Sequence, residues 1–248
     1  SFRADLFLVS HGNMAFSSKP PRIGRPIPRR RLGSSCGRFR NPAVKSAPIP
    51  PNSRMDALFH LRDMIASLDG PLVAALAARA RLLRNDAIYA VNQTPPAGLD
   101  ALATSYAKSR TLAGRVQLLR APYLSVIVPR LCVPGDAPLE REACLAADIA
   151  CLNAMARRLA LSVHVATRKR QALPQTLQQA VATRNPDVVE QAITNAAVEA
   201  DVLARVAAHA RKAEATPGTI DAITQFYADW LIPLSRKIQV HDLLSPAE

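Results

Sequence analysis

The sequence predicts an all-α protein, a helical bundle preceded by a basic tail. The chain is 49% hydrophobic but only 4% aromatic, and it is rich in Ala and Leu, which favour helices over sheets. After residue 54, apolar residues recur at steps of three and four, as on one face of a helix. No segment shows the period-two alternation that is typical of a half-buried strand.

The first 54 residues differ from the rest in charge and composition. They hold eleven Lys or Arg and one acid, and so carry +10 of the net charge of +13. They are rich in Pro, Arg and Ser and lack helical periodicity, which predicts a disordered basic tail over 1–54 and one folded domain over 55–248. The tail is interpreted either as an organelle transit peptide or as sequence upstream of a start at Met55. Because the body carries only +3, we expect no nucleic-acid partner.

Neither membrane insertion nor a metal is indicated. No apolar run approaches the ~18 residues that span a bilayer. The four cysteines have no metal-ligand spacing, and Cys144 and Cys151 lie two helical turns apart on one face, where they would not form a disulfide. We therefore expect a reducing compartment, the cytoplasm, or a plastid if 1–54 is a transit peptide.

The first half of the body predicts helices interrupted by Pro-containing turns. A helix begins at Met55, and Asp69-Gly70-Pro71 predicts a kink or restart with Asp69 as N-cap, after which helix resumes to about Asn92. Residues 94–98 form a loop, and a weaker helix spans about 99–118. A short helical piece over 123–132 is expected to be ended by Pro129 and by Val133-Pro134-Gly135.

The second half predicts longer helices. They span about 138–170, 175–183, 185–213 and 219–245. The third should begin with Asn185 as N-cap and Pro186 at the first helical position.

Three polar sets lie at helical spacing within these apolar helices. Arg158 and Lys169 are eleven residues apart, about 20° past three full turns, so both lie on one face. The other two sets are i,i+4 pairs, Asn195 with Glu199 and Ser235 with Gln239. Taken singly, each set is more often a solvated stripe. Together they suggest polar groups around a small dianionic ligand, because burying them unpaired costs several kcal/mol.

The local contexts of these sets resemble one family. Residues 156–169 resemble the Arg-to-Lys segment of the all-helical chorismate mutases, and Ile193-Thr-Asn-Ala-Ala-Val-Glu199 looks like the "ITNxAVE" of the eukaryotic type. The stretch 232–244 looks like "IPLTKEVEVEYLL", and Leu61-Arg-Asp63 resembles the first arginine segment. With 79–92 and 123–136, six segments match in order over about 55–245.

The resemblance implies a helical bundle of the chorismate mutase type, chorismate as substrate, no cofactor, and a homodimer. The implied reaction is the intramolecular [3,3] rearrangement of chorismate to prephenate in phenylalanine and tyrosine synthesis, which needs positioning and electrostatics and no nucleophile. The implied catalytic residues are Arg158, Lys169, Glu199 and Gln239, and the implied substrate-binding residues are Arg62, Asn195 and Ser235.

The residue types suit these roles. Arg62 and Arg158 can bind the two carboxylates through forked donors. Lys169 and Gln239 can both donate to the ether oxygen, where negative charge grows. Glu199 can accept from the ring hydroxyl, while Asn195 and Ser235 can bind a carboxylate and hold neighbouring side chains.

The chain also departs from the family pattern. Ser235 replaces Thr, and Gln239 replaces the glutamate of the eukaryotic type with the amide of the small bacterial type. Regulated members carry a Gly-Ser pair and a nearby Thr where this chain has residues 139–146, and the connection from Asn92 to Tyr123 is shorter. These departures predict an enzyme without feedback by aromatic amino acids. The alternatives are an isochorismate pyruvate-lyase-like enzyme and a catalytically silent homologue acting as a protein-binding effector.

Overall fold

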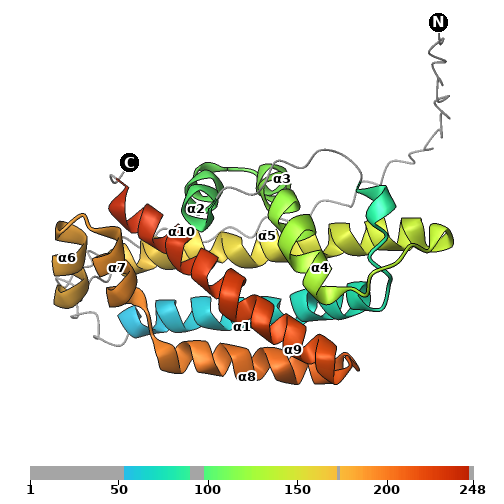
Figure 1. Ribbon diagram of the computed structural model, residues 1–248. Helices are drawn as coiled ribbons and strands as arrows, with labels where there is room; N and C mark the ends of the chain where they lie inside the picture. Colours follow the sequence, from blue (N-terminus) through green and yellow to red (C-terminus); the bar gives the residue numbers. More distant parts are fainter. Residues whose placement is uncertain (1–52, 90–97, 172–173, 246–248) are drawn as a thin grey trace, which may run out of the picture. The chain divides into compact units, whose positions relative to one another are not determined.

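The regular structure that the chain forms is helical. The computed structural model describes residues 53–89, 98–171 and 174–245, in which each regular element is a helix or helical turn (Figure 1). The predicted all-α class is therefore confirmed. The predicted tail lies outside the described residues, except for Ser53 and Arg54, which begin the first helix.

Four helices form the frame of the body. The two longest, α1 (Ser53–Ala80) and α5 (Arg141–Gln171), pack along each other, and α8 (Ala196–Lys212) packs on α1 (Figure 1). The C-terminal α10 (Ile232–Leu244) packs on α5, on α2 (Leu99–Lys108) and on α7 (Pro186–Ile193). The helix-helix contacts thus bring together segments that are more than 100 residues apart in the chain.

Shorter elements connect and flank this frame. They are η1 (Asp86–Ile88), α3 (Leu112–Pro122), the π-helical turn η2 (Tyr123–Ile127), α4 (Val128–Leu131), η3 (Pro138–Glu140), α6 (Gln175–Ala182), α9 (Pro217–Phe226) and the π-helical turn η4 (Tyr227–Leu231).

Two predictions for α1 are wrong. The predicted restart is absent, because the helix runs through Pro71 without a break and Asp69 is an interior residue rather than an N-cap. The Asp69 carboxylate is fully buried and binds arginines of α5 and α8, which replaces its predicted capping role. The helix also ends at Ala80, well before the predicted Asn92, because the buried side chain of Arg79 binds the carbonyls of the residues that follow and so turns the chain.

Two predicted single helices are each divided by a cap. The helix expected over 99–118 is α2 and α3, separated where the Thr111 hydroxyl accepts from the Gly114 amide. The helix expected over 185–213 is α7 and α8, separated where Asn195 accepts from the Val198 amide at 3.1 Å. In both cases a polar side chain accepts a hydrogen bond from a backbone amide and so begins a new helix. The spacing of apolar residues does not reveal this local preference.

The other helix predictions are closer. The helices α5 and α6 match within a few residues, and Asn185 and Pro186 begin α7 as predicted. The last predicted helix is present as α9, η4 and α10 in succession. Helical structure continues through Pro129, because the proline lies near the start of α4, where its missing N–H is not needed, and it ends at Leu131, just before the predicted stop at Val133-Pro134-Gly135.

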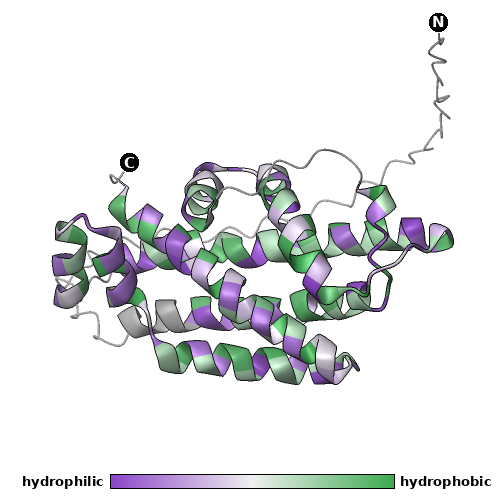
Figure 2. Ribbon diagram, in the orientation of Figure 1, coloured by the Kyte–Doolittle hydropathy of each residue, from purple (hydrophilic) through white to green (hydrophobic). Residues whose placement is uncertain are grey.

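The core divides into a large and a small cluster of buried apolar residues. The large one is centred on α1, α5, α9 and η4, and the small one joins α6, α7 and α10 to the end of α5. Figure 2 shows polar and apolar residues mixed along the helices, as expected for amphipathic helices around a core. No helix among the described residues is long and apolar enough to cross a membrane.

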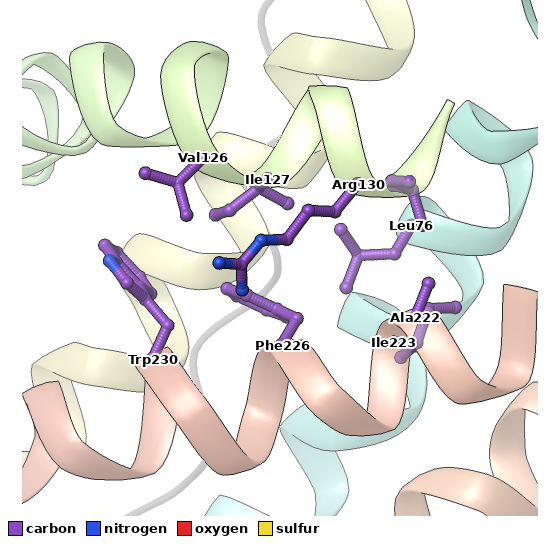
Figure 3. A pocket seen from close by; sticks show the side chains of 9 residues that line it. Leu76, Val126, Ile127, Arg130, Ala222, Ile223, Phe226 and Trp230 are labelled. Carbon is purple, nitrogen blue, oxygen red and sulfur yellow. The ribbon is translucent and has the colours of Figure 1, made fainter. Parts of the chain in front are cut away.

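A small hollow between α4 and α9 is too small for a substrate. Its volume is about 10 Å³, and apolar side chains including Leu76, Ile127 and Phe226 line it, with the side chain of Arg130 extending across it (Figure 3). Such a space is at the lower limit for a single water molecule.

Candidate active site

A much larger cavity of about 450 Å³ lies between α1, α5, α8 and α10. Its size is within the range of small-molecule sites. All seven residues singled out from the sequence line it. They are Arg62 of α1, Arg158 and Lys169 of α5, Asn195 and Glu199 at the start of α8, and Ser235 and Gln239 of α10. The fold therefore brings to one space side chains that are up to 177 positions apart in the chain.

The lining of this cavity is rich in cations. It contains five Lys or Arg and three Asp or Glu, together with apolar side chains from all four helices. The cationic groups come from α1, α5, α8 and α10, so that an anion inside would meet positive charge from several directions. This arrangement suits a compact ligand with more than one negative charge.

Arg158 is the most deeply placed cation of the site. The residue is 4% exposed, and its Nε donates to Asp69 Oδ1 at 2.9 Å. Its Nη1 is buried and has no hydrogen-bond partner among the described residues. A buried donor without a partner is costly, and because Arg158 lines the cavity, its guanidinium is placed to bind a ligand carboxylate.

A chain of polar contacts joins α5 to α10 at the other side of the cavity. Lys169 Nζ donates to Gln239 Oε1 at 3.0 Å, and Gln239 Nε2 donates to the Ser235 carbonyl at 3.2 Å. The Ser235 hydroxyl lies 2.8 Å from that of the fully buried Ser162. These contacts fix the orientation of the Gln239 amide and keep its nitrogen near the cavity.

Lys169 is perturbed by its position. Burial, with a smaller contribution from the positive charge of Arg62, lowers the pKa of Lys169 to about 8. An ammonium group with a pKa near 8 is still mostly protonated at neutral pH, and it is a stronger proton donor than an exposed lysine. Strongly perturbed groups in a cavity are typical of functional sites.

The carboxylate of Glu199 is held by an arginine that the sequence reading did not select. Arg236 Nη1 donates to Glu199 Oε1 at 2.7 Å, and Arg236 Nε donates to Glu190 Oε1 at 3.2 Å. Glu199 Oε2 makes no hydrogen bond within the described part of the chain, which leaves it available to a ligand donor.

Two predicted residues have less constrained positions. Asn195 is the N-cap of α8 rather than part of a continuous helix, so its Oδ1 is already occupied by the Val198 amide. Its amide nitrogen remains a potential donor. Arg62 is exposed at the edge of the cavity, where its long side chain can reach inwards.

The sequence reading missed Asp69 as a site-supporting residue and missed Arg205 and Arg236 as lining residues. Arg205 could have been found, because it follows Val198 and Val202 at helical spacing, and all three line the cavity. A charged residue at such a position interrupts an otherwise apolar face. Asp69 carried no comparable signal, because Gly70 and Pro71 made a capping role the better prediction.

The buried cysteines lie outside this site and are poor nucleophiles. Burial raises the pKa of Cys132 to about 11 and that of Cys151 to about 12, so both are neutral thiols at pH 7. Both are free, as is Cys144. Among the described residues, no group of three or more His, Cys, Asp or Glu is placed to hold a metal ion.

Fold and site together define a helical protein with a cation-rich cavity between α1, α5, α8 and α10. Comparison with known proteins identifies the family that it resembles. Residues 141–240 match the family model "Chorismate mutase type II". This segment includes α5 to α9 and most of α10, and therefore six of the seven predicted residues.

Individual chorismate mutases are also similar to this chain in sequence. A chorismate mutase of Schizosaccharomyces pombe is 30% identical over 132 residues, which are 50% of this chain and 53% of the relative. One of Trichoderma parareesei is 27% identical over 139 residues, which are 49% of this chain and 52% of the relative. The chain thus spans about half the length of the curated relatives it matches.

Solved structures share the fold. The Aro7p chorismate mutase from Candida albicans, in complex with L-Trp, superposes with a TM-score of 0.62 at 20% identity, over 79% of this chain and 93% of that one. The chloroplast chorismate mutase from Zea mays gives 0.61 at 19%, over 75% and 94%. The predicted resemblance to all-helical chorismate mutases of the eukaryotic type is therefore confirmed, as is the fold.

Proposed function

We propose that this protein is a chorismate mutase, an isomerase that converts chorismate to prephenate. The observation that carries the proposal is the single cavity in which all seven motif residues meet. The matches to chorismate mutases by sequence and by fold support it.

The proposed reaction needs no group transfer to the protein. In chorismate the ether C–O bond breaks while a C–C bond forms within the same molecule, so that no proton or electron has to enter or leave. The protein must hold the compact conformer and stabilise the charge separation of the transition state. Arg158 and Arg62 would bind the two carboxylates, since both line the cavity and offer forked donors.

Lys169 and Gln239 are placed to stabilise the developing charge. They are already in hydrogen-bond contact with each other, so both can approach one ligand oxygen. Lys169 would donate from its ammonium group and Gln239 from the second hydrogen of its amide. These bonds strengthen as the ether oxygen becomes negative, which lowers the barrier rather than only tightening binding. Glu199 would accept from the ring hydroxyl, with Asn195 and Ser235 as additional polar contacts.

The test is direct. Purified protein is mixed with chorismate, and the loss of chorismate absorbance and the appearance of prephenate are followed. Prephenate formation well above the spontaneous rate supports the proposal. Release of pyruvate from isochorismate, without prephenate from chorismate, would favour the lyase alternative instead. No turnover of either compound would favour the catalytically silent homologue.

We further propose that the chain forms a homodimer. Four large apolar side chains are exposed near the start of α5, namely Val133, Leu139, Leu145 and Ile149. Leu145 and Ile149 are one helical turn apart, and exposed apolar residues in such a group are typical of an interface. Light scattering should give about twice the monomer mass, and Ile149→Glu should shift the protein towards monomer.

We also propose that aromatic amino acids do not regulate the enzyme. The altered segment 139–146 supports this, since Cys144 is buried and accepts from the Asn85 side chain, while Leu139 is fully exposed. Tyrosine and tryptophan at millimolar concentration should leave the dependence of rate on chorismate hyperbolic and unchanged. Inhibition by tyrosine or activation by tryptophan would contradict the proposal.

The compartment is also a proposal. The free cysteines suit a reducing compartment, so we propose the cytoplasm, or a plastid if residues 1–54 act as a transit peptide. Fluorescent fusions of the full chain and of a chain starting at Met55 would distinguish the two. Plastid import of the full chain alone would identify the transit peptide.

A further inference from the structure

Asp69 is a buried carboxylate shared by two arginines of the cavity. It is fully buried, and its Oδ1 accepts from Arg158 Nε at 2.9 Å. Its Oδ2 accepts from Arg205 Nη2 at 2.9 Å and from Arg205 Nε at 3.3 Å. Tyr227 completes the set with a hydroxyl 3.4 Å from Oδ1. One carboxylate on α1 thus connects α5, α8 and η4.

The geometry of these contacts leaves part of each guanidinium unused. Arg205 is bound to Asp69 through two nitrogens, which fixes its plane, and its third nitrogen makes no hydrogen bond within the described residues. Within the described part of the chain, Arg158 is bound only through Nε, and its Nη1 has no hydrogen-bond partner. Both arginines line the cavity.

We propose that Asp69 is a positioning residue for the proposed reaction: it holds Arg158 and Arg205 so that their remaining nitrogens face a carboxylate of the substrate. The inference rests on the proposed function. Asp69 does not itself line the cavity and acts through the arginines. It also orients the face of α8 that follows Glu199 relative to the face of α5 that carries Arg158.

Charge balance supports this role. Without Asp69, two arginines at least partly withdrawn from water would face each other, and the nearest acceptor for both would be the ligand or solvent. With it, one negative charge partly neutralises two positive ones, and the site retains net positive charge for the ligand. The lining residues Asp63 and Asp201 make no hydrogen bond to either arginine within the described residues, so they do not replace Asp69.

Close packing around Asp69 constrains it further. The next residue is Gly70, where an added Cβ would lie 3.3 Å from His209 Cε1 of α8. The glycine therefore permits α8 to approach α1 closely, which brings Arg205 within reach of Asp69. Ala at this position should weaken the same contact without altering any charge.

The chain provides a matched control. The second buried Asp–Arg pair between α1 and α5, Asp148 with Arg79, lies away from the cavity lining. Asp69→Asn and Asp148→Asn both remove one buried negative charge with little change in shape. Both should lower the melting temperature, but only the first should alter the site.

The experiment is steady-state kinetics with chorismate at a temperature at which each variant is folded. Asp69→Asn should lower kcat/KM by about 10- to 100-fold, and Asp69→Glu should recover part of the loss. Asp148→Asn should stay within about twofold of the wild type. If the wild type is active, a kcat/KM of Asp69→Asn equal to that of the wild type would overturn the inference. A loss of kcat/KM in Asp148→Asn as large as in Asp69→Asn would also overturn it. Inactivity of the wild type would instead contradict the proposed function.

A second variant applies if Asp69→Asn does not fold. The Arg205 side chain is 34% exposed, so Arg205→Lys should be tolerated. It keeps the charge but cannot hold Asp69 through two nitrogens. We expect a loss of kcat/KM of about five- to tenfold with a melting temperature near that of the wild type. A kcat/KM within about twofold of the wild type would overturn the inference.

Discussion

The helices α1 and α5 are joined by two buried Arg–Asp pairs that differ in how fully the arginine is hydrogen-bonded. In one pair the arginine is on α1, with Arg79 Nε 2.7 Å from Asp148 Oδ1. In the other the arginine is on α5, with Arg158 Nε 2.9 Å from Asp69 Oδ1. The pairs are ten residues apart on each helix, about 15 Å along the axis. The side chains of both pairs are buried, but the two arginines differ in their other hydrogen bonds.

Arg79 uses each of its nitrogens within the protein. Beside the bond to Asp148, its Nη1 donates to the Leu83 carbonyl at 3.1 Å, and its Nη2 donates to the Arg84 carbonyl at 3.0 Å and to the Tyr89 hydroxyl at 3.1 Å. Asp148 also accepts from Tyr89 and from Tyr123. This network is closed and stabilises the end of α1.

Arg158 has an open network instead, because its Nη1 has no hydrogen-bond partner among the residues that the structure describes. The comparison teaches that burial of an arginine does not by itself mark a site. The two arginines differ in the number of donors left without a partner among the described residues, and only Arg158 of the two lines the cavity.

The largest expected effect is on the closed network. Arg79→Ala leaves Asp148 buried without its charged partner, so the free energy of unfolding should fall by about 3–5 kcal/mol. Urea denaturation measures this, and the folded protein should retain its kcat. A stable Arg79→Ala variant with reduced activity would reverse the assignment of the two regions.

The open network should respond in the opposite sense. Arg158→Ala should lower kcat/KM by at least about two orders of magnitude, since a buried charge-assisted contact to the ligand is lost. The loss in stability should be smaller than for Arg79→Ala, because Asp69 keeps Arg205 as a partner. Activity and stability that are both normal would exclude Arg158 from the site.

Much of this comparison could be read from the sequence. The spacing of Arg158 and Lys169, and of Ser235 and Gln239, predicted shared faces that do line one cavity. The partners of Arg158 could not be predicted, because Asp69 lies 89 positions away and Gly70-Pro71 suggested a break in α1. Arg79 has all its donors bonded because the chain after Ala80 turns back over its side chain. The spacing of apolar residues in a helix does not predict such a turn.

The helix breaks had a similar cause. Thr111 and Asn195 are N-caps that begin new helices where the sequence predicted continuous ones. Asn195 therefore lies at the start of α8, and Glu199 is an acidic residue in the first turn of that helix. Asn195 and Glu199 nevertheless both line the cavity, because the first turn of α8 lies beside it. Local caps thus changed the elements but not the composition of the site.

The two regions should also differ in their dependence on pH. Gln239 donates through an amide, whereas Gln239→Glu must be protonated to donate to the ether oxygen. The wild type should keep kcat/KM nearly constant from about pH 5 to 7.5, and Gln239→Glu should lose activity as pH rises across this range. Parallel profiles for the two proteins would mean that Gln239 does not contact that oxygen. Asp148→Asn should follow the wild-type profile.

A smaller effect is expected above this range. The pKa of Lys169 is lowered to about 8 by burial and by Arg62, so the ammonium donor is present below pH 8 and lost above it. The wild-type kcat/KM should therefore fall above about pH 8. Since the folded pKa lies below the unfolded one, this residue should make the protein more stable as pH rises from about 8 to 10.5. A profile that stays flat to pH 9.5 would contradict the lowered pKa.

The central claim is that the open arginine network binds a dicarboxylate and the closed one does not. Thermal unfolding with and without prephenate, the product of the proposed reaction, tests it most directly, because a ligand that binds only the folded state stabilises it by about 2.7 kcal/mol at 100 times its Kd. The account predicts a rise in melting temperature for the wild type and for Asp148→Asn, and none for Arg158→Ala. An equal rise in Arg158→Ala, or a rise lost only in Asp148→Asn, would contradict it.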